Sequence, residues 1–152
     1  MATREFPLTP EPVEPVNTSW RTIRTDLPAP ESVELLRTLR EVEPRSMGGQ
    51  PPVVWHRGQG ATVSDAWGNR WLDFSSGVLV TSSGHGHPDI CRAITAQAEQ
   101  GLYHAYCFAT DIRRRLVAEI HRWLPDELPR VFLLTTGSEA TECCIKLART
   151  RG

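Results

Sequence analysis

Residues 130–149 read RVFLLTTGSEATECCIKLAR, which joins an apolar run to a helix-start signal. The apolar run over residues 131–134 is continuous, and this is the pattern of a strand that is covered on both faces. Thr136 and Glu139 then fit the S/T-x-x-E capping box, in which each side chain accepts a hydrogen bond from the other residue's backbone N–H. The stretch therefore predicts a buried strand, a tight glycine turn and the start of a helix.

The predicted turn is a candidate phosphate site. Gly137 and Ser138 would be the first two helical residues, whose backbone N–H groups have no partner inside the helix. Such groups bind anions together with the positive end of the helix dipole. Gly137 has no side chain to block the approach, and Ser138 adds a hydroxyl donor. The alternative is a well-capped connection that holds no ligand, because strand–turn–helix junctions are common.

Composition excludes several classes of function. The chain has 152 residues, of which 39% are hydrophobic and 23% charged, as in a globular domain. A net charge of -1 gives no general attraction to nucleic acid or to an anionic membrane. No run approaches the ~20 apolar residues that a membrane-spanning helix needs, and residues 1–16 lack a signal-peptide pattern. We therefore expect a cytoplasmic protein that binds neither nucleic acid nor membrane.

The metal-binding residue types do not form a metal motif. The four cysteines lack metal-ligand spacing and are expected to be reduced thiols; they are Cys91, Cys107, Cys143 and Cys144. His85 and His87 flank a glycine, but neither a third histidine nor a pair of aspartates lies near them in the sequence. The favoured interpretation is a loop that leads into a helix at Pro88, and no metal site is predicted.

The remaining sequence predicts helices and one small β unit. Residues 1–30 are rich in proline and are expected to be extended or disordered, with Trp20 and Ile23 as candidate anchors. Apolar residues recur at helical spacing, so amphipathic helices are expected over residues 31–43, 88–100 and 110–124. A hairpin with Gly68-Asn69 at its tip is expected to join strands over residues 61–65 and 70–74, with residues 53–56 as a candidate third strand and residues 75–88 as a loop.

Several short motifs follow one another over residues 50–152. They are GATVSD (60–65), GNRWLDF (68–74), SGV (76–78), GHGHP (84–88) and TGSEA (136–140), the last followed by Glu142, Ile145, Lys146, Leu147, Ala148 and Arg149. In this order and spacing the chain resembles the N-terminal part of class III pyridoxal-phosphate-dependent aminotransferases. This is the ω-aminotransferase group, which includes 4-aminobutyrate, ornithine and acetylornithine aminotransferases, and the resemblance points to a 4-aminobutyrate-like or general ω-amino-acid aminotransferase.

The resemblance implies an α/β fold, the N-terminal portion of a fold-type-I pyridoxal-phosphate-dependent transferase. Residues 1–48 would be an extended proline-rich segment and a helix. Residues 49–109 would be the N-terminal part of the small domain with a linker helix. Residues 110–152 would be the incomplete start of the large cofactor-binding domain, so that the chain combines a small β-rich unit with the first strand–helix unit.

The resemblance also implies a function. An amino group would pass from an ω-amino acid of the 4-aminobutyrate type to a 2-oxo acid, with pyridoxal 5′-phosphate as cofactor and a homodimer as the full-length enzyme. Gly137 and Ser138 would bind the cofactor phosphate, and Val78 would lie near the substrate. No catalytic residue is assigned, because the Schiff-base lysine of the family lies beyond Gly152 and Lys146 matches a position on the phosphate helix. The chain alone is expected to be inactive; the alternative function is an inactive remnant or a weak phosphate-binding module.

Overall fold

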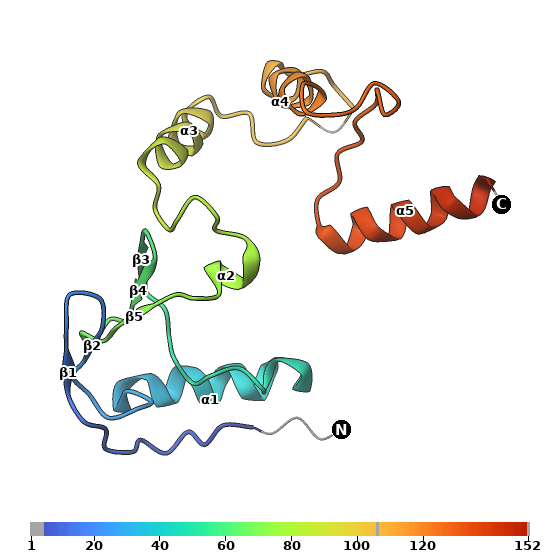
Figure 1. The fold of residues 1–152 in the computed structure, drawn as a ribbon. Coiled ribbons are helices and arrows are strands. Elements are labelled where there is room, and N and C mark those ends of the chain that lie inside the picture. Colours follow the sequence, from blue (N-terminus) through green and yellow to red (C-terminus); the bar gives the residue numbers. More distant parts are fainter. Residues whose placement is uncertain (1–4, 106, 152) are drawn as a thin grey trace. The chain divides into compact units, whose positions relative to one another are not determined.

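The computed structural model describes residues 5–105 and 107–151, which form a mixed α/β fold (Figure 1). The chain divides into two compact units, Met1–Gln100 and Gly101–Gly152. The first unit contains the sheet and helices α1 to α3, and the second contains α4 and α5. The three domains expected from the resemblance stay a prediction, because compactness alone does not identify the domains of a family.

An antiparallel sheet of five strands, in the order β1-β2-β5-β4-β3, is the centre of the first unit. The strands are β1 (Val16–Asn17), β2 (Thr22–Ile23), β3 (Arg57–Gln59), β4 (Thr62–Ser64) and β5 (Arg70–Leu72). The expected hairpin is confirmed: β4 and β5 pair antiparallel, with Val63 opposite Trp71. Gly68 has a positive φ of 94° at the tip, a backbone conformation that glycine adopts without strain.

One expectation about the sheet is wrong. The third strand is β3 and not residues 53–56, of which only His56 bonds to the hairpin, through its N–H to the Ser64 carbonyl at 2.8 Å. The described part of residues 1–30, expected to be extended or disordered, contains two short strands, β1 and β2, which the sequence did not indicate because two residues are too few to show an alternating pattern. Ile23 is an anchor, as expected, with 2% of its surface exposed, whereas Trp20 is 62% exposed in the turn between these strands.

The first unit has a small core with a polar centre. Its buried apolar residues, among those that the structure describes, are Ile23, Ala29 and Val63. Asn69 is fully buried, and its side-chain oxygen accepts the Arg24 N–H at 2.8 Å. Its side-chain nitrogen donates to a carboxylate oxygen of Asp65 at 2.6 Å. One amide therefore joins the segment after β2 to the β4–β5 hairpin.

Two expected helices of the first unit are confirmed. Helix α1 (Val33–Val42) follows a 3-10 turn (Pro30–Ser32), and a second 3-10 turn (Arg45–Met47) comes after it. Helix α3 (Pro88–Glu99) begins with the proline at its first position, where the missing N–H costs nothing. Its apolar side is not packed inward as expected, because Ile90 is 45% exposed and Ile94 is 64% exposed.

The described part of the second unit contains two helices, α4 (Asp111–His121) and α5 (Gly137–Arg151). The Thr110 side chain caps α4 by accepting the Arg113 N–H at 3.3 Å, and the helix ends three residues before position 124. The strand expected over residues 131–134 is wrong. A strand needs a neighbour for its backbone groups, and the described part of residues 101–151 contains none. Phe132 is therefore 75% exposed.

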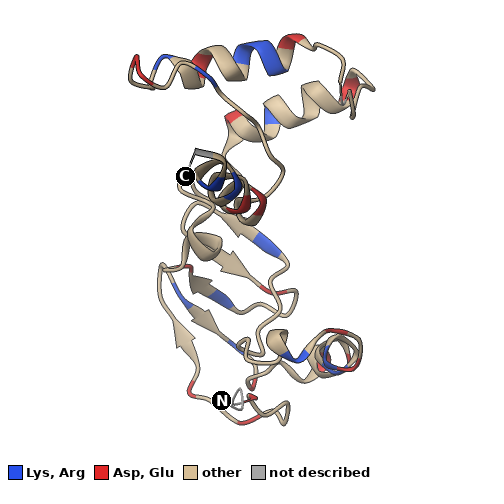
Figure 2. Ribbon diagram, turned by 90° about the vertical axis from the view of Figure 1, so that its right-hand side faces the viewer, with Lys and Arg blue, Asp and Glu red and all other residues tan. Residues whose placement is uncertain are grey.

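Acidic and basic residues are interleaved along the helices (Figure 2). Exposed pairs such as Glu34–Arg37, Asp111–Arg114 and Glu142–Lys146 lie three or four residues apart. Each contributes only about 0.3–0.5 kcal/mol, so these pairs do not determine the fold. Within the described ranges, no helix combines the length and the apolar character that crossing a membrane requires.

Candidate functional site

The start of α5 carries the reciprocal hydrogen bonds that the sequence predicts. Thr136 Oγ1 accepts the N–H of Glu139 at 3.1 Å. In return, the Glu139 carboxylate accepts the N–H of Thr136 at 3.0 Å and that of Thr135 at 3.1 Å. The helix begins at Gly137. The capping box is therefore confirmed, and its acidic member also places a negative charge in the first turn, where it interacts favourably with the helix dipole.

Two backbone donors at this helix start stay free. The N–H groups of Gly137 and Ser138 have no hydrogen-bond partner among residues 5–105 and 107–151. A Cβ atom placed on Gly137 would meet nothing within 4 Å, so the approach to these donors is open. Open N–H groups at the positive end of a helix suit an anion such as a phosphate. The binding role of Gly137 and Ser138 stays a prediction, but the geometry it requires is present.

Lys146 does not belong to this helix start. It follows Ser138 by eight residues, about 12 Å along the helix at 1.5 Å per residue. Its Nζ lies 2.9 Å from the Glu142 carboxylate, and both side chains are more than half exposed. Lys146 therefore forms a surface ion pair, and nothing places its amine beside the free N–H groups.

The second candidate site is α2 (Ser76–Leu79), a left-handed turn in the segment that was expected to be a loop. The φ angles are 53° at Ser76, 60° at Gly77, 62° at Val78 and 66° at Leu79. A left-handed conformation costs roughly 1–2 kcal/mol for each residue other than glycine. Strain of this kind persists only where surrounding contacts enforce it, and it is concentrated at functional sites.

The carboxylate of Asp73 provides several of those contacts, beside backbone hydrogen bonds that Leu79, Val80 and Thr81 donate within the segment. Its Oδ1 accepts the Ser75 hydroxyl at 2.6 Å and the Ser75 N–H at 2.9 Å, and its Oδ2 accepts the Gly77 N–H at 2.7 Å. The side chain is 2% exposed. Hydrogen bonds from the Ser75 hydroxyl, from the His85 ring and from the two N–H groups hold the pKa of Asp73 well below its usual range, against the opposite effect of burial. Asp73 is therefore ionised at neutral pH, and its carboxylate accepts hydrogen bonds from all of these donors.

His85 completes the network around Asp73. Its Nε2 lies 2.7 Å from Asp73 Oδ2, so this nitrogen carries the hydrogen and donates to the carboxylate. Its backbone exchanges two hydrogen bonds with Gly60, each 2.8 Å long. The ring also meets the Trp55 indole edge-on, with 5.8 Å between the ring centroids. His85 is thus bonded or packed on several sides by residues of the first unit.

His87 has a different environment, and the two histidines do not share a ligand. The Nδ1 of His87 accepts the Asp89 N–H at 3.3 Å at the start of α3. Within residues 5–105 and 107–151, no group of three or more His, Cys, Asp or Glu side chains is placed to hold a metal ion. The cysteines Cys91, Cys107, Cys143 and Cys144 are free thiols.

Glycines make room for His85. A Cβ on Gly58 would lie 2.7 Å from the Cβ of His85, a distance that real structures do not show. A Cβ on Gly84 would lie 3.1 Å from the Cα of Gly60, and one on Gly86 would lie 3.1 Å from the Gly58 carbonyl oxygen. Backbone therefore packs on backbone here. The glycine pairs Gly58/Gly60 and Gly84/Gly86 are a feature of the sequence from which this contact could have been suspected, but they do not identify Asp73 as the partner of His85.

Val78 lies on the outside of the left-handed turn. It is 76% exposed, and its apolar neighbours Phe74, Leu79 and Val80 are 93%, 86% and 77% exposed. These four exposed apolar residues belong to the same segment as Ser75 and Gly77, which donate hydrogen bonds to Asp73. Val78 belongs to the first unit, whereas Gly137 and Ser138 belong to the second. The substrate role of Val78 stays a prediction.

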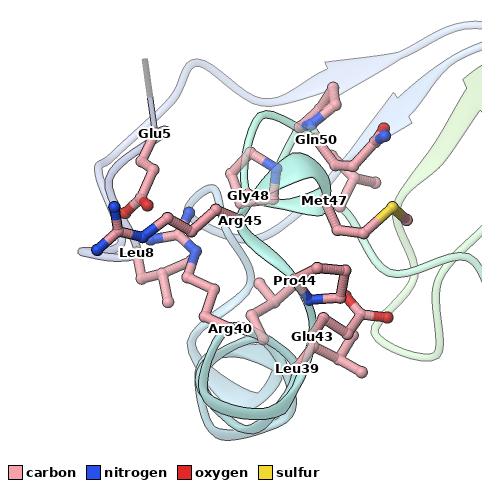
Figure 3. Close-up of a pocket in the computed structure, with 14 residues that line it drawn as sticks. Glu5, Leu8, Leu39, Arg40, Glu43, Pro44, Arg45, Met47, Gly48 and Gln50 are labelled. Carbon is pink, nitrogen blue, oxygen red and sulfur yellow. The ribbon is translucent and has the colours of Figure 1, made fainter. Parts of the chain in front are cut away.

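A cavity of about 320 Å³ in the first unit is separate from the residues that the sequence singles out (Figure 3). It lies between the end of α1 and the loop that follows, with Leu39 and Met47 on its wall. Arg40 crosses to the N-terminal segment and donates to the Phe6 carbonyl at 2.5 Å. This cavity contains neither Val78 nor the free N–H groups of α5, and it adds nothing to the candidate sites.

The fold and the capped helix start define a mixed α/β protein with open backbone donors at the beginning of a helix. Residues 45–152 match the family described as aminotransferase class-III. An acetylornithine aminotransferase from Corynebacterium efficiens is 38% identical over 110 residues, which cover 68% of this chain and 27% of the relative. The 5-aminovalerate aminotransferase DavT from Pseudomonas aeruginosa is 35% identical, over 76% of this chain and 28% of its own length.

A 4-aminobutyrate aminotransferase from Mycobacterium leprae is 34% identical over 134 residues, which cover 86% of this chain and 30% of the relative. The chain belongs to the class III aminotransferase family. It spans between a quarter and a third of the length of these three curated relatives. The resemblance of the short motifs to this family is thereby confirmed.

Proposed function

We propose that this chain supplies the phosphate-binding turn and a substrate-facing turn of a pyridoxal-phosphate-dependent aminotransferase. The reaction transfers an amino group from an ω-amino acid of the 4-aminobutyrate type to a 2-oxo acid. Two relatives support the donor class, since they are named for 5-aminovalerate and 4-aminobutyrate, which are both ω-amino acids. The complete enzyme is a cytoplasmic homodimer in this proposal.

The observation that carries the proposal is the free pair of N–H groups at the capped start of α5. Gly137 and Ser138 hold the cofactor phosphate through these donors, and the Ser138 hydroxyl adds a third. The capping box keeps the donors in place, because Thr136 and Glu139 bond each other at 3.0 and 3.1 Å. When bound, pyridoxal phosphate supplies the electron-accepting ring that amino transfer needs.

The phosphate turn is one wall of a cofactor site. A helix start stabilises an anion by about 0.3–1 kcal/mol, or up to ~2 kcal/mol when it is partly buried. Millimolar affinity already needs about 4 kcal/mol. Gly137 and Ser138 thus fix the orientation of the phosphate, while most of the binding free energy comes from other contacts.

We infer that the 152-residue chain does not transfer amino groups by itself. Covalent catalysis on this cofactor uses a lysine amine. Lys146 is the single lysine of the sequence, and it forms an exposed ion pair with Glu142. After incubation with one equivalent of pyridoxal phosphate and removal of the unbound cofactor by gel filtration, borohydride reduction should leave Lys146 unlabelled, as peptide mass spectrometry would show. Cofactor that stays tightly bound through gel filtration and is trapped on Lys146 would contradict this inference.

A chimera tests the proposed function directly. Residues 45–152 replace the matching segment of the acetylornithine aminotransferase from Corynebacterium efficiens. We expect a folded enzyme that binds pyridoxal phosphate and transfers amino groups. Ser138→Ala should weaken cofactor binding by roughly tenfold, the effect of one charge-assisted hydrogen bond. Thr141→Ala, one turn further along α5, is the matched control and should leave the affinity unchanged.

The alternative, a weak phosphate-binding module without enzymatic activity, gives a different result. The folded chimera would then bind inorganic phosphate at Gly137 and Ser138 but would not transfer amino groups. A folded chimera that binds neither phosphate nor pyridoxal phosphate would contradict both functions. Amide chemical shifts of the two residues distinguish these outcomes, because they report anion binding independently of turnover.

A further inference from the structure

We propose that His85 is a positioning residue, which acts through Asp73 to fix the left-handed turn α2 and with it the side chain of Val78. The proposal rests on the proposed function only for the substrate role of Val78. The contacts that connect His85 to the turn do not depend on that role. Both His85 and the turn donate a hydrogen bond to the same oxygen atom of the Asp73 carboxylate.

That oxygen is Oδ2 of Asp73. It accepts the His85 Nε2–H at 2.7 Å and the Gly77 N–H, also at 2.7 Å. Gly77 is the second residue of the turn, with φ 60° and ψ 33°. The histidine and the strained backbone therefore meet at one atom, and a shift of the ring is transmitted to the turn. Since the Asp73 side chain is 2% exposed, water does not readily replace the ring as a donor.

His85 can serve as a fixed reference because the sheet holds it. Its N–H and carbonyl both bond to Gly60, directly after β3. Its Cβ fits only because Gly58, within β3, has no side chain. Trp55, in the segment that precedes β3, packs edge-on against the ring. The position of the imidazole is thus determined by the backbone of β3 and not by the loop that contains it.

The left-handed turn determines where the exposed apolar side chain of Val78 lies. In the left-handed region, side chains leave the backbone in a different direction from those of a right-handed turn. With φ 62° and ψ 59°, Val78 points to the outside and is 76% exposed. If the turn relaxed to negative φ, Val78 would leave this position. The wall that Val78 offers to a substrate therefore depends on His85.

The first experiment measures the turn in the full 152-residue chain by NMR. Positive φ angles at Ser76, Val78 and Leu79 give strong nuclear Overhauser effects between the N–H and Hα of the same residue. We expect His85→Ala to abolish these signals and to raise amide exchange at Gly77 by roughly tenfold or more. The reason is that the Asp73 carboxylate, which accepts the Gly77 N–H, is no longer held in place by the His85 ring. The amide shift of Asn69 should stay unchanged and would show that the hairpin is folded.

Two further variants separate positioning from general stability. His85→Gln keeps an N–H donor at the end of the side chain, and it should restore the positive φ angles and the protection of Gly77. His87→Ala removes the neighbouring histidine, which does not contact Asp73, and should change neither quantity. Positive φ angles that persist in His85→Ala, or a His85→Gln variant that behaves like His85→Ala, would overturn the proposal.

The role of Val78 is measured separately, so that the two proposals fail in different ways. Saturation transfer between 5-aminovalerate, used as the probe, and the Val78 methyl groups reports contact with a substrate of the proposed class. We expect contact in the chimera that contains residues 45–152 and its loss when His85→Ala is introduced there, with recovery in His85→Gln. Absence of contact in a folded chimera would overturn the substrate role of Val78, while the φ angles alone would still decide whether His85 positions the turn.

Discussion

Asn69 Nδ2 lies 2.6 Å from Oδ2 of Asp65, and both residues are buried. The Asn69 N–H also donates to Oδ1 of Asp65 at 2.8 Å, and the Asp65 N–H donates to the Asn69 carbonyl at 3.1 Å. These bonds close the turn of the hairpin at both ends. Because the Asn69 side-chain oxygen faces the Arg24 N–H, the same pair also fixes the position of β2 against the hairpin.

Asn69→Ala should therefore destabilise the sheet strongly. The substitution leaves Oδ2 of Asp65 and the Arg24 N–H each without the bond to the Asn69 side chain, at about 1–3 kcal/mol for each group, whereas Oδ1 of Asp65 keeps its two backbone N–H donors. We expect the free energy of unfolding of the first unit to fall by roughly 2–5 kcal/mol. Urea unfolding and amide exchange at Arg24 measure the loss. Asn17→Ala, at an exposed edge-strand position, is the control and should change stability by less than about 0.5 kcal/mol.

Thr136→Ala tests the helix start in the second unit. The substitution removes the acceptor for the Glu139 N–H, which lies 3.1 Å from Oγ1. Loss of a threonine cap costs about 0.5–2 kcal/mol of helix stability, so the first turn of α5 should fray. Amide exchange at Glu139 and Ala140 should accelerate, and the helical circular dichroism should fall slightly. Thr141→Ala, which removes only a bond to the Gly137 carbonyl, should leave the Glu139 amide protected.

Gly58→Ala tests the close approach between β3 and His85. The added Cβ would lie 2.7 Å from the Cβ of His85, so the histidine or the strand has to move. Overpacking of this kind typically costs about 1–3 kcal/mol. We expect lower resistance to urea and loss of the 2.7 Å contact between His85 and Asp73, visible as a shift of the His85 ring protons. Gly48→Ala meets its nearest atoms at 3.4 Å, an ordinary contact, and should be nearly neutral.

Local signals predicted the parts of the fold that depend on neighbouring residues. Gly68-Asn69 predicted the hairpin, and the spacing of Thr136 and Glu139 predicted the capping box. In each case the residues that determine the structure lie within a few positions of one another. The same reason explains why the sequence alone suffices to name the candidate phosphate donors, Gly137 and Ser138.

Features that depend on distant partners were not predicted. The described structure has no strand over residues 131–134, because a strand needs a neighbour for its backbone groups and an apolar run alone does not supply one. Strand β2 pairs with β5 across almost 50 residues of sequence, and its two residues are too few to show the alternating apolar and polar pattern of a strand. The link from Asp73 to His85 joins two motifs whose spacing does not indicate contact. The left-handed turn depends on that link and was missed with it.

The pH dependence of the turn follows from Asp73. Its pKa is held below the ordinary value of about 3.9, so its charged form contributes stability to the folded state. That contribution is complete above roughly pH 4 and is lost as the pH falls further, because the unfolded state takes up a proton first. Protection of the Gly77 amide should therefore decline progressively between about pH 4 and pH 2.

Asp73→Asn should remove this dependence. The variant cannot accept the same four hydrogen bonds as a charged group, so Gly77 should exchange faster than in the wild-type chain at pH 7. As the pH falls below about 4, the wild-type chain should approach the variant, and the difference between them should shrink. Asp126→Asn, at an exposed position of the second unit, is the control and should follow the wild-type profile. A difference between Asp73→Asn and wild type that stays constant from pH 7 to pH 2 would show that the charge of Asp73 does not stabilise the turn.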